Sequence, residues 1–262
     1  MTVGVPPARA GGCPGAPPPL QTMVDAEYAF ARSARGSVRQ AFLAVLAEDA
    51  WVLAPGPTPA RAFYESQPES PGTLEWFPHA AVVAASGDLG FTSGPYVYAR
   101  DAKQSFGHFL TIWRRAADCT WRVAFDGGIA HGRQPEEAPV DAAGPAPAPT
   151  APVAVPAADA ATAFQSVAAR EGLGAGLRTY ARNEGFRLLL EGQPPMDLAR
   201  AERQLRTRVV KTAWRAVAHG ASLDATLRYE VGALAHGAYA QIWQYDPRTA
   251  NWGLRVLLLT EP

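Results

Sequence analysis

Two seven-residue stretches decide the fold: residues 107–113 read GHFLTIW, and residues 237–243 read GAYAQIW. Each stretch ends in Ile-Trp and is followed, after a short turn, by a second tryptophan, Trp121 or Trp252. Such runs, bounded by turn residues, predict a strand that continues through a hairpin into the next strand. Because the same stretch occupies the same place in both halves of the chain, we expect an internal duplication.

The surrounding elements follow one order in both halves. In the first half, helical patterns begin at Asp25 and after Ser37, a residue that can cap a helix, and a short strand and a short helix follow at 50–53 and near Phe63. Strand-like runs then cover 73–85, 90–99, 106–115 and 120–130. The second half repeats helices at 158–170 and 173–181, a strand at 186–190, a helix at 196–206, and strands at 209–218, 223–234, 237–245 and 252–260. Helices followed by a curved antiparallel sheet predict an α+β fold.

Composition marks the boundaries between these halves. The N-terminal residues and the stretch from Gln134 to Pro156 are rich in proline and alanine and cannot bury enough apolar surface to fold. We therefore expect a disordered tail (1–22), a first domain (23–132), a Pro/Ala-rich linker (133–157) and a second, degenerate domain (158–262).

Charge and cysteine content exclude several classes of protein. Lysine plus arginine equals aspartate plus glutamate at 24 each, and no Lys/Arg run exceeds two residues, which argues against a nucleic-acid-binding protein although local basic patches remain possible. No apolar run is long enough for a membrane span. The two cysteines, Cys13 and Cys119, predict neither a disulfide framework nor a metal cluster. We expect a cytoplasmic protein, because no secretory signal is visible, with export as the alternative if the true start lies upstream.

Four segments carry a resemblance to a known family. Residues 46–53 (LAEDAWVL), 87–96 (GDLGFTSGPY), 107–115 (GHFLTIWRR) and 121–126 (WRVAFD) resemble the SnoaL-like, ketosteroid-isomerase-like branch of the nuclear transport factor 2-like superfamily. The resemblance implies two cone-shaped α+β barrel domains, each a curved antiparallel sheet wrapped over helices around a pocket. The second half lacks several of these motifs. Fold alone does not assign an activity.

Ketosteroid isomerase chemistry is unlikely on this chain, because its key residue types are missing. The carboxylate base of the family falls on Ala54, and the acidic donor falls on Gly107. The tyrosine of the first helix falls near Phe30, with Tyr28 two residues away. Without a base, the proton that this reaction moves has no acceptor.

Other residues remain as candidates for a site. His108 and Asp126 form a general acid/base pair if both face into the cone. The simpler interpretation is a hydrogen-bonded strand histidine and an aspartate that ends its strand. Aromatic and polar residues of the first half either line a ligand pocket or fill the core and the sheet interface: Trp51, Tyr64, Trp76, Phe91, Ser93 and Tyr96.

Two functions follow from these residues. We favour non-catalytic binding of a small apolar molecule or a protein partner through the cone of the first domain and the sheets. The alternative is an isomerase, dehydratase or cyclase acting on a small organic substrate through His108 and Asp126. No cofactor and no metal site is expected, since the remaining histidines lack ligand spacing. We expect the two domains to pair within the chain, sheet against sheet, with Trp113 and Trp243 near the contact.

Overall fold

The computed structural model describes Cys13 and residues 15–135, 140–143, 156–182, 184–205 and 214–260. Most of the tail and much of the linker that the sequence predicts lie outside the described residues. The first part of the strand expected at 209–218 also lies outside them. Within the described part, no helix is long and apolar enough to cross a membrane.

The described residues of the first half form three helices and eight strands. The helices are α1 (Pro19–Ala34), α2 (Val38–Val45) and α3 (Ala60–Ser66). The strands are β1 (Leu46–Leu53), β2 (Pro57–Pro59), β3 (Thr73–Trp76), β4 (Ala80–Val83), β5 (Leu89–Arg100), β6 (Lys103–Arg115), β7 (Trp121–His131) and β8 (Asp141–Ala143). They form one sheet in the order β2-β1-β7-β6-β5-β4-β8, and β3 pairs with β5 beside β4.

Local chemistry explains these helices. Proline opens α1, where a missing N–H costs nothing. Met23, Phe30 and Ala34 lie on its buried face at helical spacing. Ser37 caps α2 as the sequence predicts, accepting a hydrogen bond from the backbone N–H of Gln40.

The second half repeats this arrangement with fewer strands. Its helices are α4 (Ala157–Glu171), α5 (Leu173–Tyr180) and α6 (Leu198–Gln204). Its strands are β9 (Arg187–Leu190), β10 (Arg215–Ala221), β11 (Leu227–Ala233), β12 (Ala238–Asp246) and β13 (Asn251–Leu259), in the order β10-β11-β12-β13-β9. In the first half β1 pairs in parallel with β7, and in the second half β9 pairs in parallel with β13. We call residues 15–135 with 140–143 the first unit, and the described residues from 156 onward the second unit. The chain thus has the α+β fold class that the sequence predicts.

Two details of the first unit differ from the sequence expectation. The single strand expected at 73–85 is two strands, β3 and β4, which are interrupted at residues 77–79 around Pro78. Both strands pair with β5, and the N–H groups of Phe77 and His79 also donate to β5. Inside the expected linker, β8 pairs in parallel with β4.

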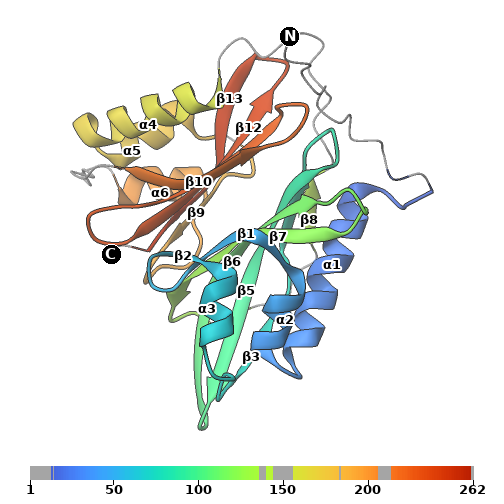
Figure 1. Ribbon diagram of the computed structural model, residues 1–262. Coiled ribbons are helices and arrows are strands. Elements are labelled where there is room, and N and C mark those ends of the chain that lie inside the picture. Colours follow the sequence, from blue (N-terminus) through green and yellow to red (C-terminus); the bar gives the residue numbers. More distant parts are fainter. Residues whose placement is uncertain are drawn as a thin grey trace, which may run out of the picture.

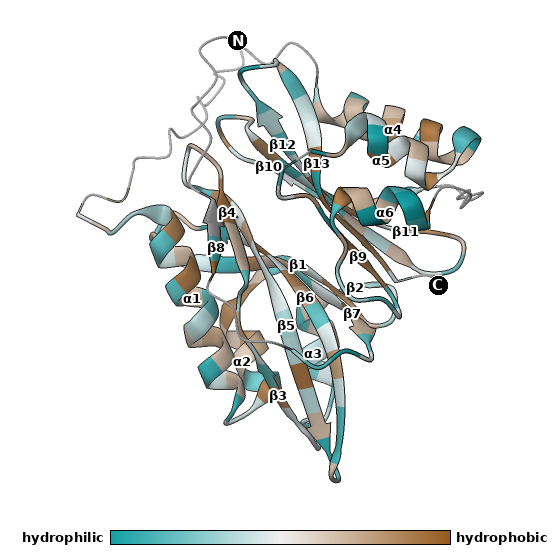
Figure 2. Cartoon of the chain, turned by 180° about the vertical axis from the view of Figure 1, so that it is seen from behind, coloured by the Kyte–Doolittle hydropathy of each residue, from teal (hydrophilic) through white to brown (hydrophobic). Residues whose placement is uncertain are grey.

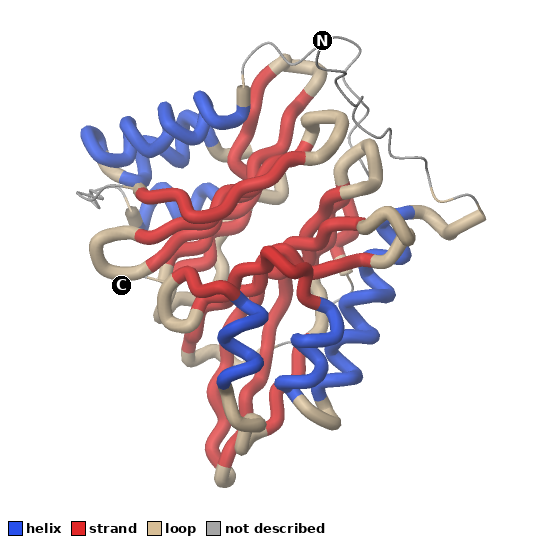
Figure 3. The backbone as a smooth tube through the Cα atoms, viewed as in Figure 1, coloured by secondary structure: helices blue, strands red, loops and turns tan. Residues whose placement is uncertain are grey.

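The two sheets face each other between the two sets of helices (Figures 1 and 3). One cluster of buried side chains contains residues of both units, among them Phe91, Leu110, Ile112 and Phe125 of the first, and Tyr229, Val231, Ile242 and Leu258 of the second. Figure 2 shows apolar residues on β9 and on neighbouring strands where the sheets meet.

Trp113 and Trp243 do not lie at this contact, and that expectation is wrong. Each is fully buried in the core between its own sheet and its own helices. Side chains alternate along a strand. Because Ile112 and Ile242 face the opposite sheet, the tryptophan that follows each of them faces the helices.

Polar contacts between the units join two equivalent turns. The backbone N–H of Ser86, between β4 and β5, donates to Asp224 Oδ2 at 2.6 Å. In return, the N–H of Leu223, between β10 and β11, donates to Asp88 Oδ2 at 3.1 Å. Each aspartate therefore holds the turn of the other unit.

A disulfide joins Cys13 to Cys119, in the hairpin between β6 and β7, with their Cα atoms 6.0 Å apart. The sequence analysis did not expect this bond, because two cysteines 106 positions apart carry no spacing signal. The bond fixes the start of the chain to the edge of the first unit.

Candidate functional site

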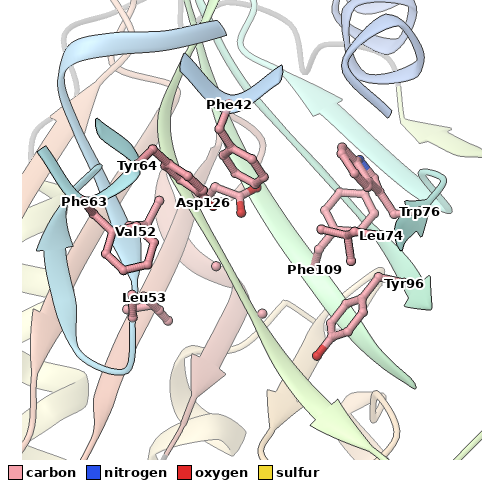
Figure 4. A pocket seen from close by; sticks show the side chains of 13 residues that line it. Phe42, Val52, Leu53, Phe63, Tyr64, Leu74, Trp76, Tyr96, Phe109 and Asp126 are labelled. Atoms are coloured by element: carbon pink, nitrogen blue, oxygen red, sulfur yellow. The ribbon is translucent and has the colours of Figure 1, made fainter. Parts of the chain in front are cut away.

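The first unit contains a cavity of about 360 Å³ between its sheet and its helices. Its walls are mainly aromatic: Phe42, Phe63, Tyr64, Trp76, Tyr96 and Phe109. Tyr64 of α3 stacks on Phe42 of α2, with ring centroids 4.2 Å apart and an interplanar angle of 17°. Figure 4 shows these rings around Asp126, the charged residue of the lining. A small number of polar groups among apolar walls is typical of ligand pockets.

Asp126 reaches this cavity because of a β-bulge. Strict alternation would place it on the face of Arg122 and Ala124. The register between β6 and β7 shifts instead, so that Trp113 pairs with Val123 and Ile112 pairs with Phe125. One extra residue in a strand turns the following side chains to the other face. Asp126 then lies opposite Thr111, on the helix side of the sheet.

The surroundings of Asp126 favour its neutral form. Thr111 Oγ1 donates a hydrogen bond to Asp126 Oδ2 at 2.6 Å. Burial raises the pKa of Asp126 to about 7, the Thr111 hydrogen bond opposes that rise, and the negative charge of Glu27 adds to it. A carboxyl group with a pKa near 7 can donate or accept a proton at neutral pH.

Tyr64 lies close enough to Asp126 to be influenced by its charge. Burial raises the pKa of the Tyr64 phenol above its ordinary value, and the charge of Asp126 adds to this rise. The phenol is therefore protonated at neutral pH and can donate a hydrogen bond into the cavity.

Glu27 is a second buried acid, which the sequence analysis missed. It lies on α1 and is fully buried. The indole N–H groups of Trp76 and Trp113 donate to its carboxyl oxygens at 2.5 Å and 3.0 Å, and the Thr92 hydroxyl donates as well. Burial raises the pKa of Glu27, against these three hydrogen bonds. The signal was present in the sequence, because Glu27 lies one helical turn from Met23 on an otherwise apolar helix face.

The proposed pairing of His108 with Asp126 is wrong. His108 lies on the opposite face of the sheet and lines a different cavity, of about 440 Å³, with Ser93, His79 and His131. Burial lowers the pKa of His108 to about 3, and the positive charges of His131, His79 and Arg187 add to this shift. Neutral His108 and Asp126 cannot act on one ligand from two separate cavities.

The candidate site residues are thus divided among three places. Tyr64, Trp76, Tyr96 and Asp126 line the aromatic cavity. Trp51 and Phe91 pack in the apolar cluster between the units. Ser93 and His108 lie at the other cavity, where the Ser93 hydroxyl donates to the Phe109 carbonyl oxygen at 2.7 Å.

The positions expected for ketosteroid isomerase groups are also informative. Ala54 lines the aromatic cavity but offers no base. A Cβ at Gly107 would lie 2.2 Å from Cζ of Tyr96, so the Tyr96 ring covers the place of the acidic donor. Phe30 is buried against Trp76, with ring centroids 4.8 Å apart, whereas Tyr28 is exposed. Among the residues that the structure describes, no group of three potential ligands could hold a metal.

At the place of Asp126, the second unit has an apolar residue. Gln241 pairs with Leu257 as Thr111 pairs with Asp126. Next to each pair the register shifts between the isoleucine and the tryptophan of the Ile-Trp sequence. Leu257 is fully buried in the core of the second unit. The polar group that marks the first cavity is therefore replaced by leucine.

Comparisons with known proteins give similar structures at low identity. No family model and no curated protein matches the chain. A nuclear transport factor 2-like protein of unknown function from Shewanella oneidensis is 13% identical, with a TM-score of 0.36, over 42% of this chain and 98% of that chain. A ketosteroid isomerase-like protein from Erwinia carotovora atroseptica is 17% identical, with a TM-score of 0.35, over 44% and 97%.

A Delta 5-3-ketosteroid isomerase from Mycobacterium sp. is 15% identical, with a TM-score of 0.34, over 43% of this chain and 92% of that chain. Identities of this size say nothing about the activity or the ligand of this chain.

Proposed function

We propose that the first unit binds a small, largely apolar molecule in its aromatic cavity, with Asp126 hydrogen-bonded to a polar group of that molecule. The observation that carries this proposal is the place of Asp126: one carboxyl group, held by Thr111, among aromatic walls. A polar group placed in this way orients a ligand, while the apolar walls provide most of the affinity.

The second unit supports the same proposal by contrast. Leu257 takes the place of Asp126. Glu27 lies three residues before the buried Phe30 of α1, and the residue three positions before the buried Phe164 of α4 is Ala161. Both acids of the first unit are thus replaced by apolar residues. A unit that serves only as a partner needs neither acid.

The test is binding of 2-naphthol, an apolar probe with one hydroxyl group, measured by isothermal titration calorimetry. We expect Asp126→Leu, which copies the second unit, to weaken binding at least tenfold, and Asp126→Asn to weaken it less. His108→Ala is the matched control, because His108 lines the other cavity and its loss should leave the affinity unchanged. Equal affinities for the native chain and Asp126→Leu would refute the proposal.

A second candidate is proton transfer on a small organic substrate, now with Asp126 as the acid or base and Tyr64 as a hydrogen-bond donor. The observation that favours it is the pKa of Asp126, raised by burial to about 7, beside a protonated phenol. The test is exchange of the α-protons of cyclohexanone in D₂O, followed by proton NMR. If the native protein catalyses the exchange and Asp126→Asn does not, this role is supported. If the exchange rate is the same for both proteins, this role is excluded.

We further propose that the two units pair in solution as they do here, as an intramolecular pseudo-dimer. The shared apolar cluster and the reciprocal hydrogen bonds of Asp88 and Asp224 support this pairing. Two copies of one fold that face each other across such contacts resemble a two-fold dimer interface.

We propose, too, that the protein matures in an oxidising compartment, the exported alternative of the sequence analysis. The disulfide between Cys13 and Cys119 supports it, because such bonds persist mainly outside the reducing cytosol.

A further inference from the structure

The aromatic cavity of the first unit adjoins a larger crevice between the two units. This crevice has a volume of about 810 Å³ and is lined by residues of both units. Leu53, Tyr96 and Gly128 line the cavity and the crevice alike. The two spaces therefore meet at these three residues of β1, β5 and β7.

The place where the two spaces adjoin is bordered by the side chains of Leu53 and Tyr96. Figure 4 shows Leu53 and Tyr96 at the same end of the aromatic cavity, away from Phe42. Gly128 adds no side chain between them. A Cβ there would lie 2.8 Å from the backbone oxygen of His108 and 3.4 Å from Cε1 of Tyr96, so a larger residue does not fit at this place.

Beyond this point, the lining comes largely from the second unit. Glu191, Arg215, Leu234 and Thr260 are among its residues there. Glu191 is fixed against the first unit, because the backbone N–H of Ala130 lies 3.2 Å from both of its carboxyl oxygens. The N–H of Gly192 also donates to the Ala130 carbonyl oxygen, at 2.8 Å. The turn after β9 is thus held over the end of β7.

We infer that the second unit completes the ligand site: a ligand whose apolar body lies in the aromatic cavity extends between Leu53 and Tyr96, and its outer end is recognised by Glu191 and Arg215. This inference rests on the proposed binding function. It gives the second unit a direct role in recognition, although that unit has Leu257 in the place of Asp126.

The crevice also indicates the chemistry of the outer end. Glu191 and Arg215 carry opposite charges on the same lining, and Thr260 adds a hydroxyl group. A charged ligand end would meet one attractive and one repulsive side chain, whereas a neutral hydroxyl or amide can accept from Arg215 and donate to Glu191. The ligand class is therefore an elongated apolar molecule with a hydrogen-bonding group at each end.

Two probes test the inference by calorimetry on the full chain: 2-naphthol, which matches the inner cavity, and 2-naphthol extended at carbon 6 by a hydroxyl-terminated pentyl chain. We expect the extended probe to bind native protein about tenfold more tightly. Glu191→Gln, which keeps an acceptor for the Ala130 N–H, and Arg215→Ala should remove most of that gain without changing the affinity for 2-naphthol. His219→Ala is the control, an exposed change on the same strand as Arg215 and outside the crevice lining.

The outcomes separate this inference from the proposed function. If Glu191→Gln and Arg215→Ala leave both affinities unchanged while Asp126→Leu weakens both, the inference is wrong and the proposed function stands. If neither probe binds, both are wrong.

Discussion

Three features determine the position and the pKa of Asp126. The β-bulge turns its side chain toward the helices, the Thr111 hydroxyl donates a hydrogen bond to it, and its burial together with the charge of Glu27 raises its pKa. An acid of this kind costs stability when it ionises in the folded protein. Its retention in an otherwise aromatic cavity is therefore more readily explained by ligand binding than by folding.

The pH dependence of stability gives a prediction for Asp126. Its pKa in the folded protein, about 7 because of burial, lies above its ordinary value of 3.8. The stability linked to its proton is therefore fully present below pH 3.8 and is lost as the pH rises through about 7. We expect the free energy of unfolding of the native chain to fall over this window by roughly 2 to 4 kcal/mol relative to Asp126→Asn. Urea denaturation at several pH values measures this, and parallel curves for both proteins would contradict it.

Glu27 gives a stability prediction of a different kind. Replacing it with leucine removes the acceptor of the Trp76 indole N–H and of the Thr92 hydroxyl, both buried, whereas the Trp113 N–H keeps Thr92 Oγ1 as an acceptor at 3.0 Å. Since each buried donor left without a partner costs about 1 to 3 kcal/mol, we expect Glu27→Leu to lower the free energy of unfolding by roughly 2 kcal/mol or more. Glu27→Gln keeps one acceptor oxygen and should cost clearly less. Chemical denaturation of both variants is the measurement, and a neutral Glu27→Leu would show that the Trp76 and Thr92 donors find other partners.

At this scale, the sequence could give residue types but not their neighbours. The aromatic candidates Tyr64, Trp76 and Tyr96 do line one cavity with Asp126. The pairing of His108 with Asp126 required both side chains to lie on the same face of the sheet. The sequence shows neither which face lines the cone nor the bulge after Val123. Glu27 could have been found, because a carboxylate among Met23, Phe30 and Ala34 breaks an apolar helix face.

At the scale of elements, the bulges and turns set where side chains point. Both β6–β7 and β12–β13 shift register beside an Ile-Trp pair. Element order and most strand runs could be predicted from periodicity and turn residues. The split of the 73–85 run falls at Pro78, a local signal that the sequence does contain. The pairing of β3 and β4 with different parts of β5 is long-range and leaves no such signal.

The disulfide gives a prediction for the β6–β7 hairpin. Peptide mapping without reductant should recover Cys13 and Cys119 in one linked pair of peptides. A bond that closes a loop of this length restricts the unfolded chain, so reduction, or Cys119→Ser, should lower the free energy of unfolding by about 2 to 4 kcal/mol. Cys13→Ser is the matched control and should behave in the same way. Free thiols at both positions in native protein would contradict the bond.

At the scale of the whole molecule, the two sheets protect each other from water. The sheet faces that meet are apolar: Leu110 and Ile112 lie on one of them, and Ile242 and Leu258 lie on the other. A large exposed apolar patch of this kind is unfavourable in a monomer. We expected a face-to-face pairing of two units because an apolar sheet face is unfavourable to expose and because linking two copies raises their effective concentration. The sequence could not show which tryptophans lie at the contact, because that depends on which face of each strand covers the helices.

Scattering gives the test of this pairing. Ile242 is 1% exposed in the shared cluster, so Ile242→Asp places an unpaired charge between the sheets. We expect small-angle scattering of this variant to show a larger radius of gyration than native protein. Arg170→Asp, an exposed change on α4, should leave it unchanged. An extended, two-lobed profile for the native chain would mean that the units do not pair.

The most direct test of the binding proposal is to locate a ligand by crystallography, either retained from the host or soaked as 2-naphthol. The structure predicts density between Tyr64 and Trp76, with a ligand oxygen within hydrogen-bonding distance of Asp126. Occupancy should be lost in crystals of Asp126→Leu and kept in those of His108→Ala. Density among the strands of the second unit around Leu257, or at His108 instead, would contradict the account.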